Sequence, residues 1–247
     1  MKKLVIHLYA ISFNEEVVMP HFLAHYSKFC DKIFIYDNFS TDRTPLICKQ
    51  YANVELLKFE THGQIRDDVY LKIKNEVWKK SRSAADYVIV CDTDEFIHHK
   101  ELERFLADAH SSGVTLFKPQ GYNMISEHIP LATVPVFDQI QFGKRSISFD
   151  KIVIFNPDKI EEINYLSGAH DCMPIGDLVY SNYEIKLLHY KYISIGYILN
   201  RYKLFSQRLS KFNKINKLGF HYLYSSQKIK REFNKILKDA ENVFNIE

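Results

Sequence analysis

The first half of the chain alternates between strand-sized apolar runs and helical segments, and this order constrains the fold more than any other feature. The spacing predicts strands at residues 4–10, 32–36, 54–59 and 87–91, and helices at residues 17–29, 44–51 and 67–82. Such alternation produces a mostly parallel sheet with helices on both faces. Ligands of these sheets bind beyond the carboxyl ends of the strands. We therefore expect an α/β, Rossmann-like domain with its site at that edge.

Polar segments follow three of the predicted strands, at residues 12–15, 37–42 and 92–95. Within the last segment, Asp92 and Asp94 are two residues apart, so an extended backbone projects both carboxylates to the same side. Such a pair can bind a hard divalent cation, Mg²⁺ or Mn²⁺, in preference to zinc. The alternative is that both acids end the strand as solvated loop residues.

The size and composition of the chain are those of an ordinary globular protein. Its 247 residues, 46% of them hydrophobic, suit one large domain or one domain with an appendage. The sequence runs from Met1 directly into the first strand pattern with no signal-peptide pattern, so we expect a cytoplasmic protein. The four cysteines lack C-x-x-C spacing, which favours reduced, packed thiols.

The second half of the chain is less regular and ends in a basic segment. We expect a helix at residues 102–109, a strand at 114–118 and a loop region at 121–135. Between Arg201 and Lys238 there are eleven Lys or Arg residues and one acid, Glu232, and apolar residues recur at helical spacing from 195 to 212 and from 229 to 244. These two amphipathic helices could pack on the parent domain, lie on an anionic membrane or bind nucleic acid.

Four motifs carry a resemblance to a known family: Asn14-Glu15, the polar run 37–44, Lys74-Asn75 and Asp92-Thr93-Asp94. In this order they resemble family 2-like glycosyltransferases, and segments 92–96 and 187–192 resemble bacterial surface-polysaccharide transferases. The resemblance implies a GT-A fold, with a nucleotide-binding half at 1–96, an acceptor half at 97–194 and a basic helical extension at 195–247. Many relatives have Asp and Gly where this chain has Asn38 and Arg43, a departure that bears on base selectivity.

The resemblance also implies a nucleotide-sugar donor of the UDP, GDP or CMP type and a bound Mn²⁺ or Mg²⁺. Asp94 is the expected direct metal ligand, Asp92 a ribose or metal-site contact, and His189 a late histidine that completes the metal site. The expected nucleotide contacts are Asn14, Glu15, Asp37, Asn38, Ser40, Arg66, Lys74, Asn75 and Asp92.

Several of these residues have simpler structural explanations. Ser40, with Thr41 and Asp42, could cap the following helix. Arg66 and Lys74 could pair with nearby acids instead of a diphosphate, and His189 could be a core histidine.

A catalytic base should lie near the acceptor hydroxyl, and His170 and Asp171 are the candidates. Asp177 is a substitute, because related inverting enzymes place their base at about that chain distance after the double-carboxylate segment. All three could instead be turn residues beside Gly168 and Gly176.

We therefore expect a metal-dependent glycosyltransferase that extends a glycan or lipid-linked glycan, in capsule or lipopolysaccharide synthesis, in the cytoplasm or at the cytoplasmic face of the inner membrane. One rival is a membrane- or nucleic-acid-binding module that uses the basic helices, although we expect no nucleic-acid partner. A nucleotidyltransferase is the second rival, but the chain has no glycine-rich phosphate loop.

Overall fold

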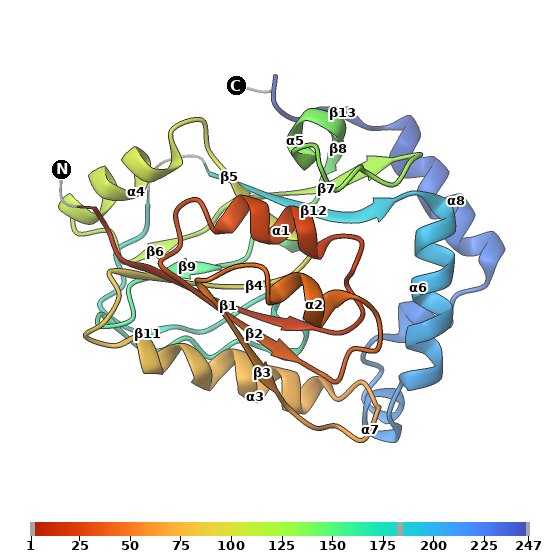
Figure 1. Ribbon diagram of the computed structural model, residues 1–247, viewed down its shortest axis with the longest axis horizontal. Coiled ribbons are helices and arrows are strands. Elements are labelled where there is room, and N and C mark those ends of the chain that lie inside the picture. The colour runs from red at the N-terminus through yellow and green to blue at the C-terminus, as the bar shows by residue number, and fades with distance from the viewer. Residues whose placement is uncertain (1–2, 182–184, 246–247) are drawn as a thin grey trace.

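A computed structural model describes residues 3–181 and 185–245 and contains a six-stranded central sheet (Figure 1). The strand order is β3-β2-β1-β4-β9-β6, in which the first four strands are parallel and the last two run antiparallel to their neighbours. The strands are β1 (Ile6–Ser12), β2 (Lys32–Asp37), β3 (Val54–Lys58), β4 (Tyr87–Asp92), β9 (Ile154–Phe155) and β6 (Leu116–Phe117). This arrangement confirms the predicted parallel-rich sheet.

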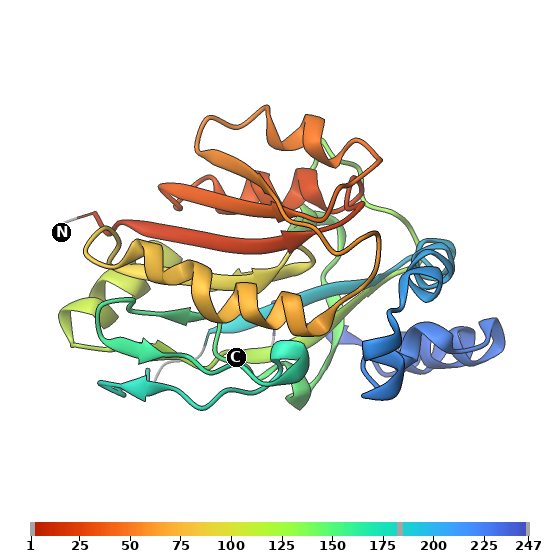
Figure 2. The same cartoon turned by 90° about the horizontal axis from the view of Figure 1, so that it is seen from below.

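Helices cover both faces of this sheet, as the alternation predicts. On one face, Ile6, Leu8 and Ala10 of β1 pack in the main core with α1, α2 and α4. On the other face, Tyr9 packs with α3 and the short 3-10 helix η1; α3 lies below the strands in Figure 1 and in front of them in Figure 2. The helices are α1 (Met19–Tyr26), α2 (Thr44–Cys48), α3 (Asp67–Glu76), η1 (Val77–Ser81) and α4 (Leu102–Ser111).

A second, five-stranded sheet occupies the region expected to form the acceptor half. Its order is β13-β8-β7-β12-β5. The strands are β5 (Glu95–His98), β7 (Gln120–Ser126), β8 (Phe142–Arg145), β12 (Lys186–Ile193) and β13 (Glu241–Asn242). The prediction of a loop from residue 121 onward was wrong, because β7 pairs with β8 on one side and β12 on the other. Pairing with distant strands determines this segment more than its local sequence does.

Short elements lie between strands of this sheet, or between it and the first one. They are α5 (Val136–Gln139), η2 (Ile147–Phe149), β10 (Ile160–Glu162), η3 (Ser167–Ala169) and β11 (Ile175–Gly176). Strands β10 and β11 form a separate antiparallel pair. The pairing of β12 with β5 sets His189 opposite Glu95, so the late histidine segment lies beside the double-carboxylate segment.

The basic C-terminal segment forms α6 (Ile195–Arg208), α7 (Lys211–Ile215), η4 (Phe220–Leu223) and α8 (Ser226–Lys238). Ile198 and Tyr202 of α6 and Ile229 and Phe233 of α8 pack against Ile125 of β7, so the apolar stripe covers the parent domain. The second helix ends earlier than its periodicity predicts, because the chain continues into β13, which pairs with β8. Among the described residues, no helix is both long enough and apolar enough to cross a membrane.

Candidate functional site

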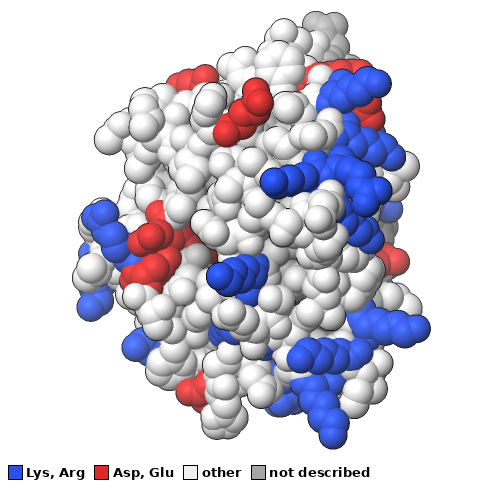
Figure 3. All heavy atoms as spheres, turned by 90° about the vertical axis from the view of Figure 1, so that its right-hand side faces the viewer, with Lys and Arg blue, Asp and Glu red and all other residues white. Residues whose placement is uncertain are grey.

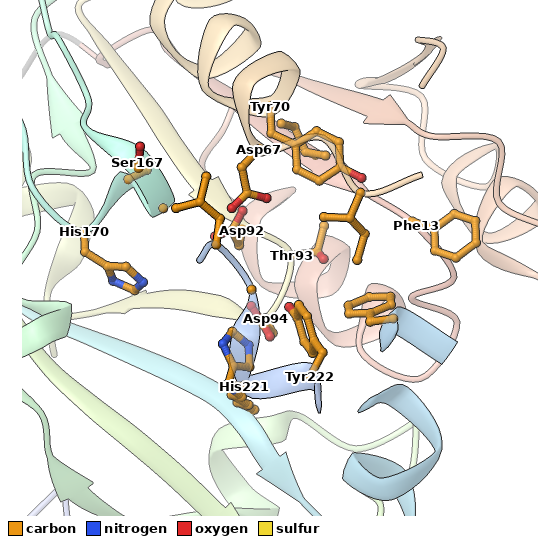
Figure 4. A pocket seen from close by; sticks show the side chains of 18 of the residues that line it. Phe13, Asp67, Tyr70, Asp92, Thr93, Asp94, Ser167, His170, His221 and Tyr222 are labelled. Carbon is orange, nitrogen blue, oxygen red and sulfur yellow. The ribbon is translucent and has the colours of Figure 1, made fainter. Parts of the chain in front are cut away.

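A cavity of about 420 Å³ lies at the carboxyl ends of β1 and β4. Figure 4 shows Asp92, Thr93 and Asp94 in its middle, Phe13 and Tyr70 towards one end, and Ser167 and His170 towards the other. The lining residues come from the end of β1, α3, residues 92–95, residues 167–170, β12, α6 and residues 217–222. Both halves of the chain and the C-terminal segment therefore contribute to one site.

Asp94 is the carboxylate at the centre of this cavity. It follows β4, is buried, and is fixed by a 2.7 Å hydrogen bond from the backbone N–H of Tyr190 to its backbone carbonyl. Its Oδ2 lies 3.4 Å from His189 Nε2 and 3.8 Å from Arg201 Nη2. Burial disfavours the charged carboxylate, but His189 and Arg201 outweigh that cost and hold the pKa of Asp94 below its usual range.

His189 is oriented towards Asp94 by Asn123, a residue that we predicted to lie in a loop. Nδ1 of His189 lies 2.9 Å from Oδ1 of Asn123 on β7, so Nδ1–H donates to this amide oxygen. The ring stacks on Phe149 with centroids 4.1 Å apart. The lone pair of Nε2 then faces a carboxylate oxygen of Asp94. Because both atoms are electron-rich, this arrangement is stable only with a proton or a cation between them.

This pair fits a divalent cation that is held by few protein atoms. Mg²⁺ and similar ions are bound through one or two carboxylates together with substrate phosphates and water. Within residues 3–181 and 185–245, no group of three or more His, Cys, Asp or Glu side chains is arranged to hold a metal ion. The structure therefore brings together two of the three expected ligands, Asp94 and His189.

Asp92, the third expected ligand, is engaged by lysines. Its Oδ1 lies 2.7 Å from Lys74 Nζ and its Oδ2 lies 3.9 Å from Lys151 Nζ. Burial opposes ionisation of Asp92, but the two lysines dominate and lower its pKa. Lys74, a predicted nucleotide contact, lines the cavity, and its partner is Asp92 rather than a neighbouring helix acid.

Lys151 and Glu95 form a buried ion pair directly behind Asp92. The side chains are 3% and 1% exposed, with Nζ of Lys151 2.6 Å from Oε1 of Glu95. The second oxygen of Glu95 accepts a 3.0 Å hydrogen bond from the backbone N–H of Asp92. This ion pair therefore holds the backbone of the double-carboxylate segment in place.

Lys191 and Arg201 bring positive charge to the cavity from the C-terminal half, and the sequence prediction missed both. Lys191 follows His189 by two residues on β12, and burial lowers its pKa to about 8. Arg201 on α6 donates to Oε2 of Glu15 at 2.5 Å. Burial raises the pKa of Glu15 to about 7, against the opposite effect of Arg201. Arginines at 201 and 208, two helical turns apart on one face, were the signal available in the sequence.

The predicted nucleotide loops hold each other in place, and of the nucleotide contacts predicted in them only Glu15 lines the cavity. The backbone N–H of Asn14 donates to Ser40 Oγ at 2.8 Å, and Thr41 N–H donates to Asn14 Oδ1 at 2.8 Å. Asp37 is fully buried and accepts from the N–H of Ser40 at 3.1 Å.

Asp42 fits the capping alternative, because its Oδ1 accepts from the N–H of Thr44 at 2.9 Å. Asn38 is also buried and turned towards Arg208.

Two of the predicted nucleotide contacts, Arg66 and Asn75, have partners within the protein. Arg66 donates to both oxygens of Asp68, at 2.8 and 2.6 Å, which is the helix-acid pairing left open by the sequence. Asn75 clamps the backbone of Tyr165, accepting from its N–H at 2.7 Å and donating to its carbonyl at 3.3 Å. Neither side chain lines the cavity. Asn75 instead helps to hold the segment that leads into η3.

The three candidate bases occupy different places. His170 lines the cavity, and its Nδ1 donates to the carbonyl of Ser148 at 3.0 Å. Partial desolvation, with Lys151 nearby, holds the pKa of His170 below its ordinary value. Asp171 is exposed outside the lining, and Asp177 pairs with Lys159 at 3.4 Å on the surface. Neither Asp171 nor Asp177 therefore lines the cavity.

Some solved structures are similar to this chain over part of their length. A search of curated proteins gave no match. Among solved structures, TarS 1-349 from S. aureus is similar over 81% of this chain and 63% of that chain, with 14% identity and a TM-score of 0.45. Glucosyl-3-phosphoglycerate synthase from Mycobacterium tuberculosis, with Mn²⁺ and UDP, is similar over 49% of this chain and 44% of that chain, with 14% identity and a TM-score of 0.34. The chain thus spans less than two thirds of either structure.

The family assignment rests on a family model. The model of glycosyl transferase family 2 matches residues 10–159, which is more than half of the chain. The match includes the ends of β1, β2 and β4 and the double-carboxylate segment. The chain belongs to glycosyl transferase family 2.

Proposed function

We propose that this protein is a metal-dependent glycosyltransferase that moves a sugar from a nucleotide-sugar donor to a glycan acceptor. The observation that carries the proposal is the meeting of Asp94 and His189, 3.4 Å apart, in a cavity with cationic side chains. A cavity of about 420 Å³ has the size of a small-molecule site. Membership of glycosyl transferase family 2 supports the same reaction class.

Asp94 and His189 are the residues that would hold the metal ion. The imidazole favours Mn²⁺ over Mg²⁺, whose sites consist mainly of oxygen atoms. A bound divalent cation neutralises negative charge that develops on a departing nucleoside diphosphate. Asp92 remains a candidate for a ribose or metal-bound water, and Lys74 keeps it ionised.

Three cations in the cavity wall would stabilise the departing diphosphate: Lys74, Lys191 and Arg201. Positive groups that are already in place cost no reorganisation when negative charge develops. Arg201 bonds Glu15 through Nη1, while Nη2 lies 3.8 Å from Asp94. One guanidinium therefore contacts both Glu15 of the nucleotide loop and Asp94, the proposed metal ligand.

His170 is the candidate base for the acceptor hydroxyl. Because Nδ1 donates to the carbonyl of Ser148, Nε2 carries the lone pair. The ring projects into the cavity from the side opposite Phe13 and Tyr70 (Figure 4). Its lowered pKa keeps the imidazole neutral near pH 7, ready to accept a proton. Asp171 and Asp177 are left without a role in this proposal.

The test combines the purified protein and Mn²⁺ with UDP-, GDP- and CMP-sugars. We expect one donor class to bind and to release its nucleoside diphosphate, or monophosphate for a CMP-sugar. Asp94→Asn should lower turnover by about 10³-fold. Asp108→Asn, which changes an exposed acid on α4, should leave turnover within about twofold. The proposal fails if no donor binds or reacts. Release of pyrophosphate would instead identify a nucleotidyltransferase.

The proposed acceptor is a glycan or lipid-linked glycan of capsule or lipopolysaccharide synthesis, used at the cytoplasmic face of the inner membrane. Support comes from α7 and η4, which expose Phe212, Ile215, Phe220 and Leu223. Exposed lysines flank these side chains, and Figure 3 shows Lys and Arg gathered on this side of the molecule. Apolar side chains among basic ones suit an anionic lipid surface better than nucleic acid.

Vesicle flotation tests this contact. Vesicles with anionic phosphatidylglycerol should carry the protein, and neutral phosphatidylcholine vesicles should not. Ile215→Asp should weaken flotation, because Ile215 is 69% exposed. Equal flotation with both vesicle types, or none with either, would contradict the membrane contact. Binding to oligonucleotides but not to vesicles would favour the nucleic-acid rival.

A further inference from the structure

Arg208, the last residue of α6, is a buried cation in the wall of the cavity. The residue is 9% exposed, and none of the carboxylates that the structure describes forms an ion pair with it. Its Nη1 is buried and has no hydrogen-bond partner within residues 3–181 and 185–245. An unsatisfied buried donor costs free energy unless a ligand supplies the acceptor. Arg208 therefore lines the cavity and has one donor that no described residue of the protein uses.

The rest of the guanidinium is fixed in place. Nε donates to the carbonyl of Gly63 at 2.9 Å, and Nη2 donates to Oδ1 of Asn38 at 2.5 Å. Cζ lies 3.2 Å from the centroid of the Phe13 ring. The backbone carbonyl of Arg208 accepts from the N–H of Ile65 at 2.7 Å. The free Nη1 is consequently pre-oriented, which reduces the entropy lost on binding.

Asn38 orients this arginine and has little capacity left for a ligand. Its Oδ1 also accepts from Thr61 at 3.0 Å and from Tyr70 at 3.3 Å, and its Nδ2 donates to the carbonyl of Phe59 at 3.1 Å. An amide at this position leaves the charge of Arg208 uncompensated, where a carboxylate would pair with it. Asn38 is thus a positioning residue for Arg208.

The walls around Arg208 suit a flat ring. Phe13, Ile65, Tyr70 and Phe205 line this part of the cavity. In Figure 4, Phe13 and Tyr70 lie on the opposite side of Asp92 and Asp94 from His170. Aromatic and aliphatic walls favour a heterocycle over a phosphate, which needs several charged or N–H donors.

We infer that Arg208 binds the nucleobase of the donor, with Nη1–H donating to a carbonyl oxygen on the edge of the base. The inference rests on the proposed function, that the cavity binds a nucleotide sugar. Uracil, guanine and cytosine carry such an oxygen. Adenine carries an exocyclic amine beside its N1 and N7 acceptors, and this amine would face the guanidinium donor to donor. Arg208 therefore selects against adenine nucleotides.

The experiment measures binding of UDP, GDP, ADP and inorganic pyrophosphate by calorimetry in the presence of Mn²⁺. The full chain is compared with Arg208→Met and with Arg82→Met. Arg82 is a matched control, because its guanidinium lies 5.2 Å from the Trp78 ring centroid and donates to backbone carbonyls outside the cavity lining.

We expect the unmodified protein to bind UDP or GDP at least about tenfold more tightly than ADP. Arg208→Met should remove most of that preference and leave pyrophosphate binding within about twofold, while Arg82→Met should change neither. An equal loss for pyrophosphate would make Arg208 a phosphate contact and overturn the inference. An unchanged preference in Arg208→Met would also overturn it.

Arg208→Gln is the second variant, since glutamine keeps a donor for Asn38 and so protects the fold. If neither variant folds, the unmodified protein decides: equal affinity for ADP, UDP and GDP overturns the inference, and a preference against ADP supports it. Failure of every nucleotide to bind the unmodified protein would remove the proposed function itself. Nucleotide binding that does not depend on Arg208 removes only this inference.

Discussion

The two walls of the cavity differ in how the sequence encodes them. The acidic wall is Asp92–Glu95, four consecutive residues at the end of a parallel strand. The cationic wall consists of His189 and Lys191 on β12 and Arg201 and Arg208 on α6. Its residues are therefore spread over two elements of the chain. The first wall is a motif, whereas the second exists only after the chain has folded.

The walls also differ in how their charges are balanced. Within the acidic wall, Glu95 is paired with Lys151 and Asp92 with Lys74. Asp94 has His189 and Arg201 as its neighbours, both from the cationic wall. The ionisation of Asp94 thus depends on residues from the C-terminal half of the chain. Asp94 is therefore the acid whose charge a ligand between the walls would affect most directly.

Loss of the Asp94 charge should have the largest effect. Asp94→Asn removes the anion that faces His189 and Arg201. We expect turnover of the preferred nucleotide sugar to fall by about 10³-fold, in the range found when a preorganised electrostatic group is removed from an active site. Product release measured at saturating Mn²⁺ gives the rate.

A matched change outside the acidic wall is the control for this variant. Asp108→Asn removes an exposed acid of α4 and should leave turnover within about twofold. If Asp94→Asn turns over at nearly the rate of the unmodified protein, the contacts of Asp94 with His189 and Arg201 serve only the structure and not the reaction.

The internal pair of the acidic wall should matter chiefly for stability. Lys151→Met leaves the carboxylate of Glu95 buried without its ammonium partner. We expect the free energy of unfolding to fall by about 3 kcal/mol, because breaking one partner of a buried pair strands the other charge. Urea denaturation measures it. The double variant Lys151→Met with Glu95→Leu should recover most of the loss; if it does not, Lys151 contributes through Asp92 rather than through Glu95.

The acidic wall and the central sheet could be predicted from the sequence for a clear reason. Residues 87–91 form an apolar strand, and the polar residues at its carboxyl end must lie at the edge where β1 and β2 also end. Hydrophobic periodicity and turn residues are local features of the sequence. For this reason β1 to β4 and α1 to α3 were found where the sequence predicted them. The function class followed from the same local motifs through the family resemblance.

Apart from His189, the cationic wall could not be predicted, because its parts meet only through distant strand pairing. Asn123 orients His189 because β7 pairs with β12, and β7 was predicted to be a loop. Folding also buries Lys151, which follows Asp150 in the sequence, against Glu95. Contacts of this kind depend on register between distant segments, which no local pattern contains.

Asn123 offers a smaller test of the meeting between the walls. Asn123→Ala removes the acceptor for Nδ1–H of His189 without removing the imidazole. Partners that orient a metal-binding histidine contribute about tenfold to a hundredfold in metal affinity, and we expect about tenfold weaker Mn²⁺ binding here. Titration with Mn²⁺ monitored by electron paramagnetic resonance measures the affinity. Unchanged affinity would mean that Phe149 alone holds the ring.

The smallest effect should come from the Glu15 and Arg201 pair, which joins the nucleotide loop to α6. Burial raises the pKa of Glu15 to about 7 in the folded state, from 4.5, so the folded protein binds its proton more tightly than the unfolded chain does. That contribution to stability is fully present below pH 4.5 and is lost as the pH rises through about 7. Urea denaturation at pH 5 and pH 8 should therefore show a larger decrease in the free energy of unfolding for the unmodified protein than for Glu15→Gln, by about 1 kcal/mol, since Arg201 stays close to the ionised carboxylate. An equal or smaller decrease in the unmodified protein would mean that Arg201 keeps Glu15 ionised throughout, and that the two walls are joined by a permanent ion pair.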